Sequence, residues 1–216
     1  MVLVELIDKF YIRCDRPKER NYFYISEVDK CQRAIFFSVK GVPCAAMEPR
    51  VSRILDQGDH VHMRLMSAMY GLGIITASEI KIPETELFHG RADGIANING
   101  ENYVVEMKSI SPFGFKKTVD APKVEHLKQL QLYLNYFNMQ KGIILMENKG
   151  DQELKEFVVE KNDLLIKKIL RDFEALREMI GRNETPKIPD RTLWEYDKCG
   201  YCPYKEHCGN VAKQGI

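Results

Sequence analysis

Residues 90–109 read GRADGIANINGENYVVEMKS and predict two antiparallel strands joined by a tight turn. Asn99-Gly100 is a strong hairpin signal, and the run that follows it is rich in β-branched and aromatic residues. Side chains two apart on a strand point to the same face, so Glu106 and Lys108 should project together while Met107 turns into the core. With Asp93 on the first strand, two carboxylates and one amine are expected around a single point.

This group of charges suits a divalent metal site. Asp93 and Glu106 offer hard oxygen ligands for Mg²⁺ or Mn²⁺, and the Met107 carbonyl could add a third. Lys108 would then orient or deprotonate an attacking water. The alternative is that these residues are ordinary solvent-face positions of a hairpin, because short motifs of common residues recur by chance.

Two further motifs lie at helical spacing on either side of the hairpin. Upstream, residues 58–62 read GDHVH within a segment whose apolar residues recur with helical period. Downstream, Gln129 and Tyr133 are four apart and share one helix face. The order G-x-x-x-H, D, E-x-K, Q-x-x-x-Y resembles the RecB-like branch of the PD-(D/E)-x-K nuclease superfamily.

The resemblance implies a role for each matching position. The implied metal ligands are His62, Asp93 and Glu106, the implied catalytic lysine is Lys108, and Gln129 and Tyr133 would shape the site or touch the nucleic acid. The family spacing from Gly58 selects His62 over His60. Ala92 stands where the family has a proline, but the chemistry needs only the carboxylate that follows.

Six cysteines form a second pattern, and three of them lie in the last eighteen residues as Cys199-x-x-Cys202-x5-Cys208. A C-x-x-C turn places two thiolates on one metal, and a third close by can join them. Cys31 is the predicted fourth ligand, with Cys44 as runner-up; Cys44 and Cys14 are otherwise expected to be buried or incidental thiols.

The nature of the cysteine site is open between an iron–sulfur cluster and zinc, because tetrahedral Cys₄ sites suit zinc equally well. One distant cysteine plus a C-terminal C-x-x-C-x5-C resembles the CRISPR-associated RecB-like exonucleases, which implies a [4Fe–4S] cluster. Disulfides are the third reading. The first ten residues, MVLVELIDKF, carry charges and lack a signal-peptide core, so a cytoplasmic, reducing location is expected and favours metal.

Composition limits the class of protein. Lys plus Arg number 32 and Asp plus Glu 31, a net charge of +1, so nucleic-acid binding must come from local patches. No run approaches the roughly 18–20 apolar residues of a membrane span, and no membrane partner is expected. In the segment 110–122, Phe113 and Phe115 lie next to Lys116-Lys117. The two aromatic rings would either stack on unpaired bases or pack as an apolar plug in the core.

The pattern of elements predicts an α/β fold. A helix is expected near 51–70, strands near 74–82, 87–97 and 102–109, a loop over 110–122 and then the Gln129 helix, with two more strands near 142–146 and 156–159 and a helix over 162–181. A further helix should begin at Ser26 and carry Cys31. This is a restriction-endonuclease-like core, a mixed central sheet flanked by helices, over 51–185. Residues 1–50 would contribute one cluster cysteine, and 186–216 the cysteine-rich tail that joins the two ends of the chain.

The expected function is a metal-dependent deoxyribonuclease with a structural iron–sulfur cluster. The resemblance implies exonuclease action on single-stranded DNA, in the 5′ to 3′ direction, with CRISPR adaptation proteins as possible partners or a role in viral or cellular DNA processing. The alternative is a DNA- or partner-binding module whose metal site has lapsed. Retention of both Glu106 and Lys108 argues against it. The sequence predicts no oligomeric state.

Overall fold

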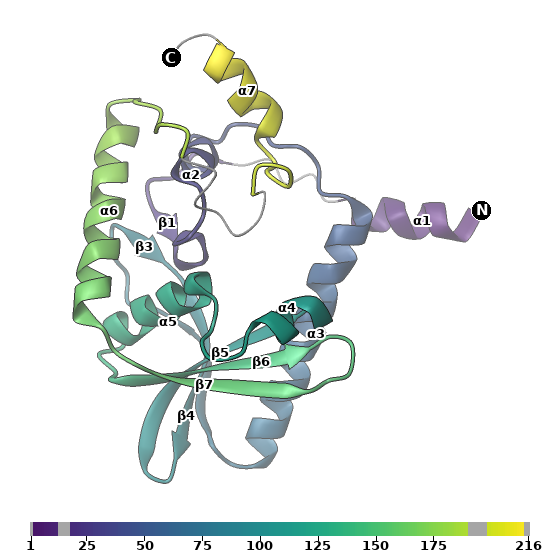
Figure 1. The fold of residues 1–216 in the computed structure, drawn as a ribbon, viewed down its shortest axis with the longest axis vertical. Helices are drawn as coiled ribbons and strands as arrows, with labels where there is room; N and C mark the ends of the chain where they lie inside the picture. The colour runs from purple at the N-terminus through teal and green to yellow at the C-terminus, as the bar shows by residue number, and fades with distance from the viewer. Residues whose placement is uncertain (1, 13–17, 190–197, 214–216) are drawn as a thin grey trace. The chain divides into compact units, whose positions relative to one another are not determined.

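The computed structural model describes residues 2–12, 18–189 and 198–213 (Figure 1). It divides into two compact units. The first unit comprises Met1–Phe23, Lys30–Ile54 and Arg171–Ile216, and the second comprises Tyr24–Asp29 and Leu55–Leu170. Among the helices of the described residues, none is both long enough and apolar enough to cross a bilayer.

The second unit is built on a five-stranded sheet in the order β2-β4-β5-β6-β7. The strands are β2 (Ile75–Lys81), β4 (Arg91–Ile98), β5 (Glu101–Ile110), β6 (Lys141–Asn148) and β7 (Leu154–Glu160). Only the β5–β6 pair is parallel. The sheet is therefore mixed, as the sequence predicted.

The central hairpin forms as predicted at Asn99-Gly100. Ile98 pairs with Glu101 across the turn. Asn99 has φ 54° and Gly100 φ 84°, both in the left-handed region that a two-residue hairpin turn of type I′ requires. This turn fixes the register of β4 against β5, and hence the place of every side chain along them.

Strand β5 sends alternate side chains to the two faces of the sheet. Val105 and Met107 are buried in a cluster with Val61 and Leu65 of helix α3 (Pro49–Gly71). Glu106, between them, and Lys108, which follows Met107, lie on the other face, where Lys108 reaches helix α5 (Val124–Tyr136). The two helices therefore cover opposite faces, which confirms the predicted α/β arrangement of a central sheet flanked by helices.

Helix α5 lies close against its face of the sheet. A Cβ added at Gly142 of β6 would stand 2.7 Å from Leu130 Cδ1 and 2.9 Å from the Val104 carbonyl oxygen. Leu130 and Leu134 are fully buried. This close packing fixes the height at which α5 presents its polar side chains to β5.

The expected single strand over 87–97 is wrong. It is split at Gly90 into β3 (Phe88–His89) and β4, and β3 pairs with β1 (Phe23–Tyr24) in a separate two-stranded sheet. A Cβ at Gly90 would lie 2.8 Å from Ile25 Cδ1, so the chain turns where only glycine allows the close approach.

The expected loop over 110–122 is also wrong, because it contains helix α4 (Pro112–Lys117). Ser111 caps this helix by accepting a hydrogen bond from the Gly114 N–H at 3.2 Å, and Pro112 occupies the first turn. Lys155 of β7 donates to the carbonyls of Phe115 and Thr118, both at 2.9 Å, and so satisfies its C-terminal end. The segment is therefore a short helix held at both ends by side-chain hydrogen bonds.

The helix expected from Ser26 is replaced by two elements, the 3₁₀ turn η1 (Ile25–Glu27) and helix α2 (Gln32–Val39). Glu27 accepts a hydrogen bond from the Tyr24 N–H at 2.9 Å, which caps the N-terminal end of the turn. Cys31 is consequently the N-cap residue of α2.

The first unit brings the two chain ends together. It contains α1 (Val2–Tyr11), α2, the C-terminal part of α6 (Asp163–Gly181) and α7 (Lys205–Lys213). The Phe23 and Phe173 rings meet edge to face at 5.0 Å, and the Ala45 N–H donates to the Pro203 carbonyl at 3.1 Å. Cys14 lies outside the described residues.

Candidate active site

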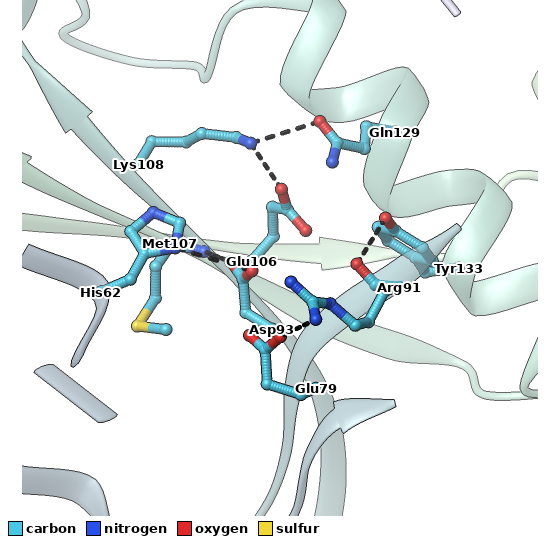
Figure 2. A network of polar contacts seen from close by, with 9 residues as sticks. All are labelled: His62, Glu79, Arg91, Asp93, Glu106, Met107, Lys108, Gln129 and Tyr133. Atoms are coloured by element: carbon cyan, nitrogen blue, oxygen red, sulfur yellow. Dashed lines mark hydrogen bonds and ion pairs between the residues drawn. The ribbon is translucent and has the colours of Figure 1, made fainter. Parts of the chain in front are cut away.

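Asp93 and Glu106 lie one position beyond the last paired residues of β4 and β5, Gly94 and Val105. Asp93 Oδ2 accepts a hydrogen bond of 2.6 Å from the Met107 N–H, so the carboxylate lies against the backbone of β5 (Figure 2). The Met107 side chain turns into the core and is 1% exposed, as predicted. The hairpin thus brings two carboxylates together across adjacent strands.

Glu106, Lys108 and Gln129 form a connected polar chain on the α5 face. Lys108 Nζ donates to Glu106 Oε1 and, at 3.2 Å, to Gln129 Oε1 (Figure 2). Glu106 is 2% exposed, and its second oxygen, Oε2, is buried and has no hydrogen-bond partner among the described residues. A buried carboxylate oxygen with no partner is costly unless a cation or donor compensates it.

The electrostatics of this group follow from burial. Burial raises the pKa of Glu106 to about 7, with the Asp93 charge adding to the effect and the Lys108 ammonium opposing it. Burial also works against the charge on Lys108, but the carboxylates of Glu106 and Asp93 outweigh it and leave the pKa of Lys108 raised. In this state Glu106 therefore takes up protons near neutral pH, while Lys108 stays an ammonium.

The two histidines of the GDHVH segment differ in position. His62 Nδ1 lies 3.6 Å from Asp93 Oδ1, whereas His60 is largely exposed and lies 3.7 Å from Asp56 on its own helix. A Cβ on Gly58 would lie 3.2 Å from Ser109 Oγ, so the helix lies close to β5 at this point. His62 is the histidine that the fold brings to the carboxylates.

Tyr133 lies one turn after Gln129 on α5 and is buried. Its hydroxyl donates to the Arg91 carbonyl at 2.8 Å and so ties α5 to the start of β4 (Figure 2). Burial, and then the Glu106 charge, raises the pKa of Tyr133, so the hydroxyl keeps its proton. Arg91 pairs with Glu79 at 2.6 Å and its charge points to that residue.

One partly buried residue near the group, His126, was not predicted from the sequence. It lies three positions before Gln129 on α5, and its side chain is 13% exposed. Its Nδ1 has no hydrogen-bond partner. The i, i+3 spacing to Gln129 was the available signal, because it puts both side chains on one helix face.

The two aromatics of α4 are separated by the helix. Phe113 is 70% exposed, with Lys117 Nζ 4.4 Å from its ring centroid. Phe115 is 3% exposed and lies under Lys155 Nζ at 4.2 Å. Of the two predicted roles, base stacking is therefore wrong for Phe115, because its ring packs in the core. Phe113 and Lys116 are exposed and could contact a ligand.

The four predicted cluster cysteines line one cavity of about 280 Å³ within the first unit. Its lining includes Cys31, Cys199, Cys202 and Cys208 and leaves out Cys44. The Cys202 N–H donates to the Cys199 carbonyl at 3.2 Å, which closes the C-x-x-C turn. Burial, and then the charges of the other three sulfurs, raises the pKa of the Cys202 thiol.

Across residues 2–12, 18–189 and 198–213, no three His, Cys, Asp or Glu side chains converge closely enough to hold a single metal ion as they stand. The ligand sets proposed for both sites remain predictions on this point.

Comparison with known proteins agrees with this architecture. A family model described as the PD-(D/E)XK nuclease superfamily matches residues 31–209. The chain is 30% identical over 136 residues to the CRISPR-associated exonuclease Cas4 of Saccharolobus solfataricus, a match that covers 59% of this chain and 64% of that protein. The chain thus spans slightly less than two thirds of the length of this relative.

Solved structures give the same fold. The protein SSO0001 superposes with a TM-score of 0.60 at 23% identity over 96% of both chains. The alkaline exonuclease LHK-Exo of Laribacter hongkongensis superposes with a TM-score of 0.57 at 14% identity, over 83% of this chain and 93% of its own. The match of the family model across most of the chain, on a fold that presents the D, E-x-K and Q-x-x-x-Y residues at one place, shows that this chain belongs to the PD-(D/E)XK nuclease superfamily.

Proposed function

We propose that the chain is a divalent-metal-dependent deoxyribonuclease with its active site at Asp93, Glu106 and Lys108. The observation that carries the proposal is the buried Glu106 Oε2. This oxygen has no hydrogen-bond partner among the described residues, and the charge of a second carboxylate, Asp93, lies close enough to act on it. A buried oxygen of this kind is expected where a cation binds.

The residues fit Mg²⁺ or Mn²⁺. Asp93 Oδ2 and Glu106 Oε1 are each held by a protein N–H, which leaves one oxygen of each carboxylate available. The His62 imidazole lies beside Asp93 Oδ1, and the Met107 carbonyl is the proposed further ligand. When bound, the ion would polarise the scissile phosphate and lower the pKa of a coordinated water.

The roles of the remaining residues follow from their contacts. Lys108 holds Glu106 Oε1 and, as an ammonium, would position the attacking water or stabilise charge on the phosphoryl oxygens. Gln129 orients Lys108 from α5. Tyr133 keeps α5 in register with β4, so that Gln129 reaches Lys108.

For the substrate, we propose single-stranded DNA cut as an exonuclease, with 5′ to 3′ polarity. The exposed Phe113 ring offers a stacking surface that only unpaired bases would use, and Lys116 and Lys117 beside it offer phosphate contacts. Similarity to Cas4 supports exonuclease action and suggests CRISPR adaptation proteins as partners. Viral or cellular DNA processing is the other setting proposed.

For the cysteine site, we propose a structural [4Fe–4S] cluster. The support is the lining of one cavity by four cysteines drawn from both ends of the chain, in a unit to which both ends belong. Four cysteine sulfurs on one cavity are the number of ligands that a [4Fe–4S] cluster or a tetrahedral metal takes. Zinc is the alternative occupant, and a cytoplasmic, reducing location is part of the proposal.

The experiment is cleavage of 5′- and 3′-labelled single strands and duplexes by anaerobically purified protein, with Mg²⁺, Mn²⁺ or chelator. The account expects metal-dependent release of mononucleotides or short products from the 5′ end of single strands. Glu106→Ala is the matched control for contaminating nuclease. Binding without metal-dependent cleavage, in protein that is folded and carries its cluster, would favour the lapsed DNA-binding module instead.

A further inference from the structure

Lys108 has an unused hydrogen-bond donor. An ammonium carries three N–H groups, and two of them are directed to Glu106 Oε1 and Gln129 Oε1. The Lys108 side chain is 22% exposed, so bulk solvent reaches it only in part. Among the described residues, the third N–H has no protein acceptor.

His126 has an unused, buried nitrogen on the same side. It lies one helical turn before Gln129, and its 13%-exposed ring leaves Nδ1 without a partner. The other nitrogen, Nε2, lies 3.5 Å from Glu125 Oε1. A proton on Nε2 faces this carboxylate, which leaves the lone pair on Nδ1.

The surroundings keep this imidazole neutral. Three charged groups act on it: the ammonium groups of Lys108 and Lys123, and the Glu125 carboxylate. Burial, followed by the two lysine charges, lowers the pKa of His126 to about 3. A neutral ring presents one donor and one acceptor at every working pH, so Nδ1 can only accept.

We propose that His126 is a positioning residue of the nuclease site, whose Nδ1 accepts a hydrogen bond from one water that in turn accepts the third N–H of Lys108. The inference rests on the proposed function, because it takes Lys108 as the lysine that acts in cleavage. A water bridging a buried donor and a buried acceptor satisfies both. With Gln129 and Glu106, this water would orient the Lys108 ammonium before DNA binds, and a phosphoryl oxygen or the attacking water would then take the third N–H.

The test compares three substitutions that differ in where they put a polar atom. His126→Asn places its side-chain oxygen near the position of Nδ1, His126→Gln places its polar atoms near Nε2, and His126→Leu keeps the bulk without either. We expect kcat to fall roughly tenfold in the Leu and Gln variants, the effect of about one hydrogen bond. His126→Asn should retain most of kcat. KM for single-stranded DNA should be unchanged in all three.

A stability measurement separates positioning from packing. Because His126→Leu keeps the bulk of the ring and loses only one water-mediated hydrogen bond, its melting temperature without metal should stay within roughly 5 °C of that of the wild type. A Leu variant as active as the Asn variant, a Gln variant as active as the Asn variant, or a rise in KM without loss of kcat would each overturn the inference.

Failure of the inference can be told from failure of the proposed function by Lys108→Ala, measured in the same assay. If Lys108→Ala is inactive and His126→Leu cuts like the wild type, the inference alone is wrong. If Lys108→Ala cuts like the wild type, the assignment of the site is wrong, and the role of His126 with it. If His126→Leu does not fold, the Asn and Gln variants still decide.

Discussion

Replacing Glu106 by glutamine should change how the stability of the metal-free protein depends on pH. A carboxyl group has a pKa of about 4.5 when exposed, and burial raises that of Glu106 to about 7. Below pH 4.5 both the folded and the unfolded chain are protonated, so the group costs nothing. Between pH 4.5 and 7 the unfolded chain releases the proton first, and folding becomes progressively less favourable.

The size of the effect follows from the shift. A difference of about 2.5 pKa units corresponds to a loss on the order of 3 kcal/mol, fully present above pH 7. In a protein of this size 1 kcal/mol moves the melting temperature by roughly 2–4 °C. Glu106→Gln removes the titrating group, although it also removes the counter-charge of Lys108 and so offsets part of the gain.

The assay is thermal unfolding followed by circular dichroism in chelator, from pH 5 to 8, for wild type and Glu106→Gln. The wild type should lose several degrees relative to the variant as the pH rises. Mn²⁺ at pH 8 should restore the wild type and stabilise the variant much less, because the variant keeps Asp93 but lacks the Glu106 carboxylate. Parallel curves across this pH range, or equal stabilisation of both proteins by Mn²⁺, would refute the reasoning.

Three other predictions test the remaining parts of the account. Lys108→Ala should lower the cleavage rate by about two or more orders of magnitude, measured under single turnover, with the circular dichroism spectrum unchanged; cleavage within a few-fold of wild type would contradict it. Phe113→Ala should weaken single-strand binding by roughly 1–3 kcal/mol in fluorescence titrations. Phe115→Ala should instead lower the free energy of unfolding by about 3–5 kcal/mol. If both substitutions change binding equally, Phe113 does not stack on the substrate. Anaerobically purified protein should contain about four irons per chain, Cys31→Ala should lose them together with stability, and Cys44→Ala should keep them; stoichiometric zinc without iron, or the reverse result for the two variants, would overturn this assignment.

The sequence was most informative where local chemistry determines the geometry. Asn99-Gly100 fixes the turn by its positive φ angles, and period-two alternation then puts Met107 in the core and Glu106 with Lys108 on the other face. The aromatic and β-branched residues Tyr103, Val104 and Val105 favour a strand, and they pair with β4. The mixed sheet and its flanking helices followed from these local rules.

The failures occurred where tertiary contact or capping overrides local pattern. Ser111-Pro112 is an N-terminal helix signal, but Gly114 and the nearby prolines favour turns, so the local pattern predicts a loop. The break between β3 and β4 depends on the approach of Ile25 to Gly90, which no local pattern shows. The free nitrogen of His126 is likewise a property of the assembled site alone.

The most direct test of the metal site is anomalous diffraction from crystals of the protein soaked in Mn²⁺. The account predicts a peak between Asp93 and Glu106, bonded to Glu106 Oε2 at roughly 2.0–2.3 Å, and its loss in Glu106→Gln. A protein that cuts DNA in Mn²⁺, yet shows no peak there or shows one at a different group of residues, would contradict the central claim.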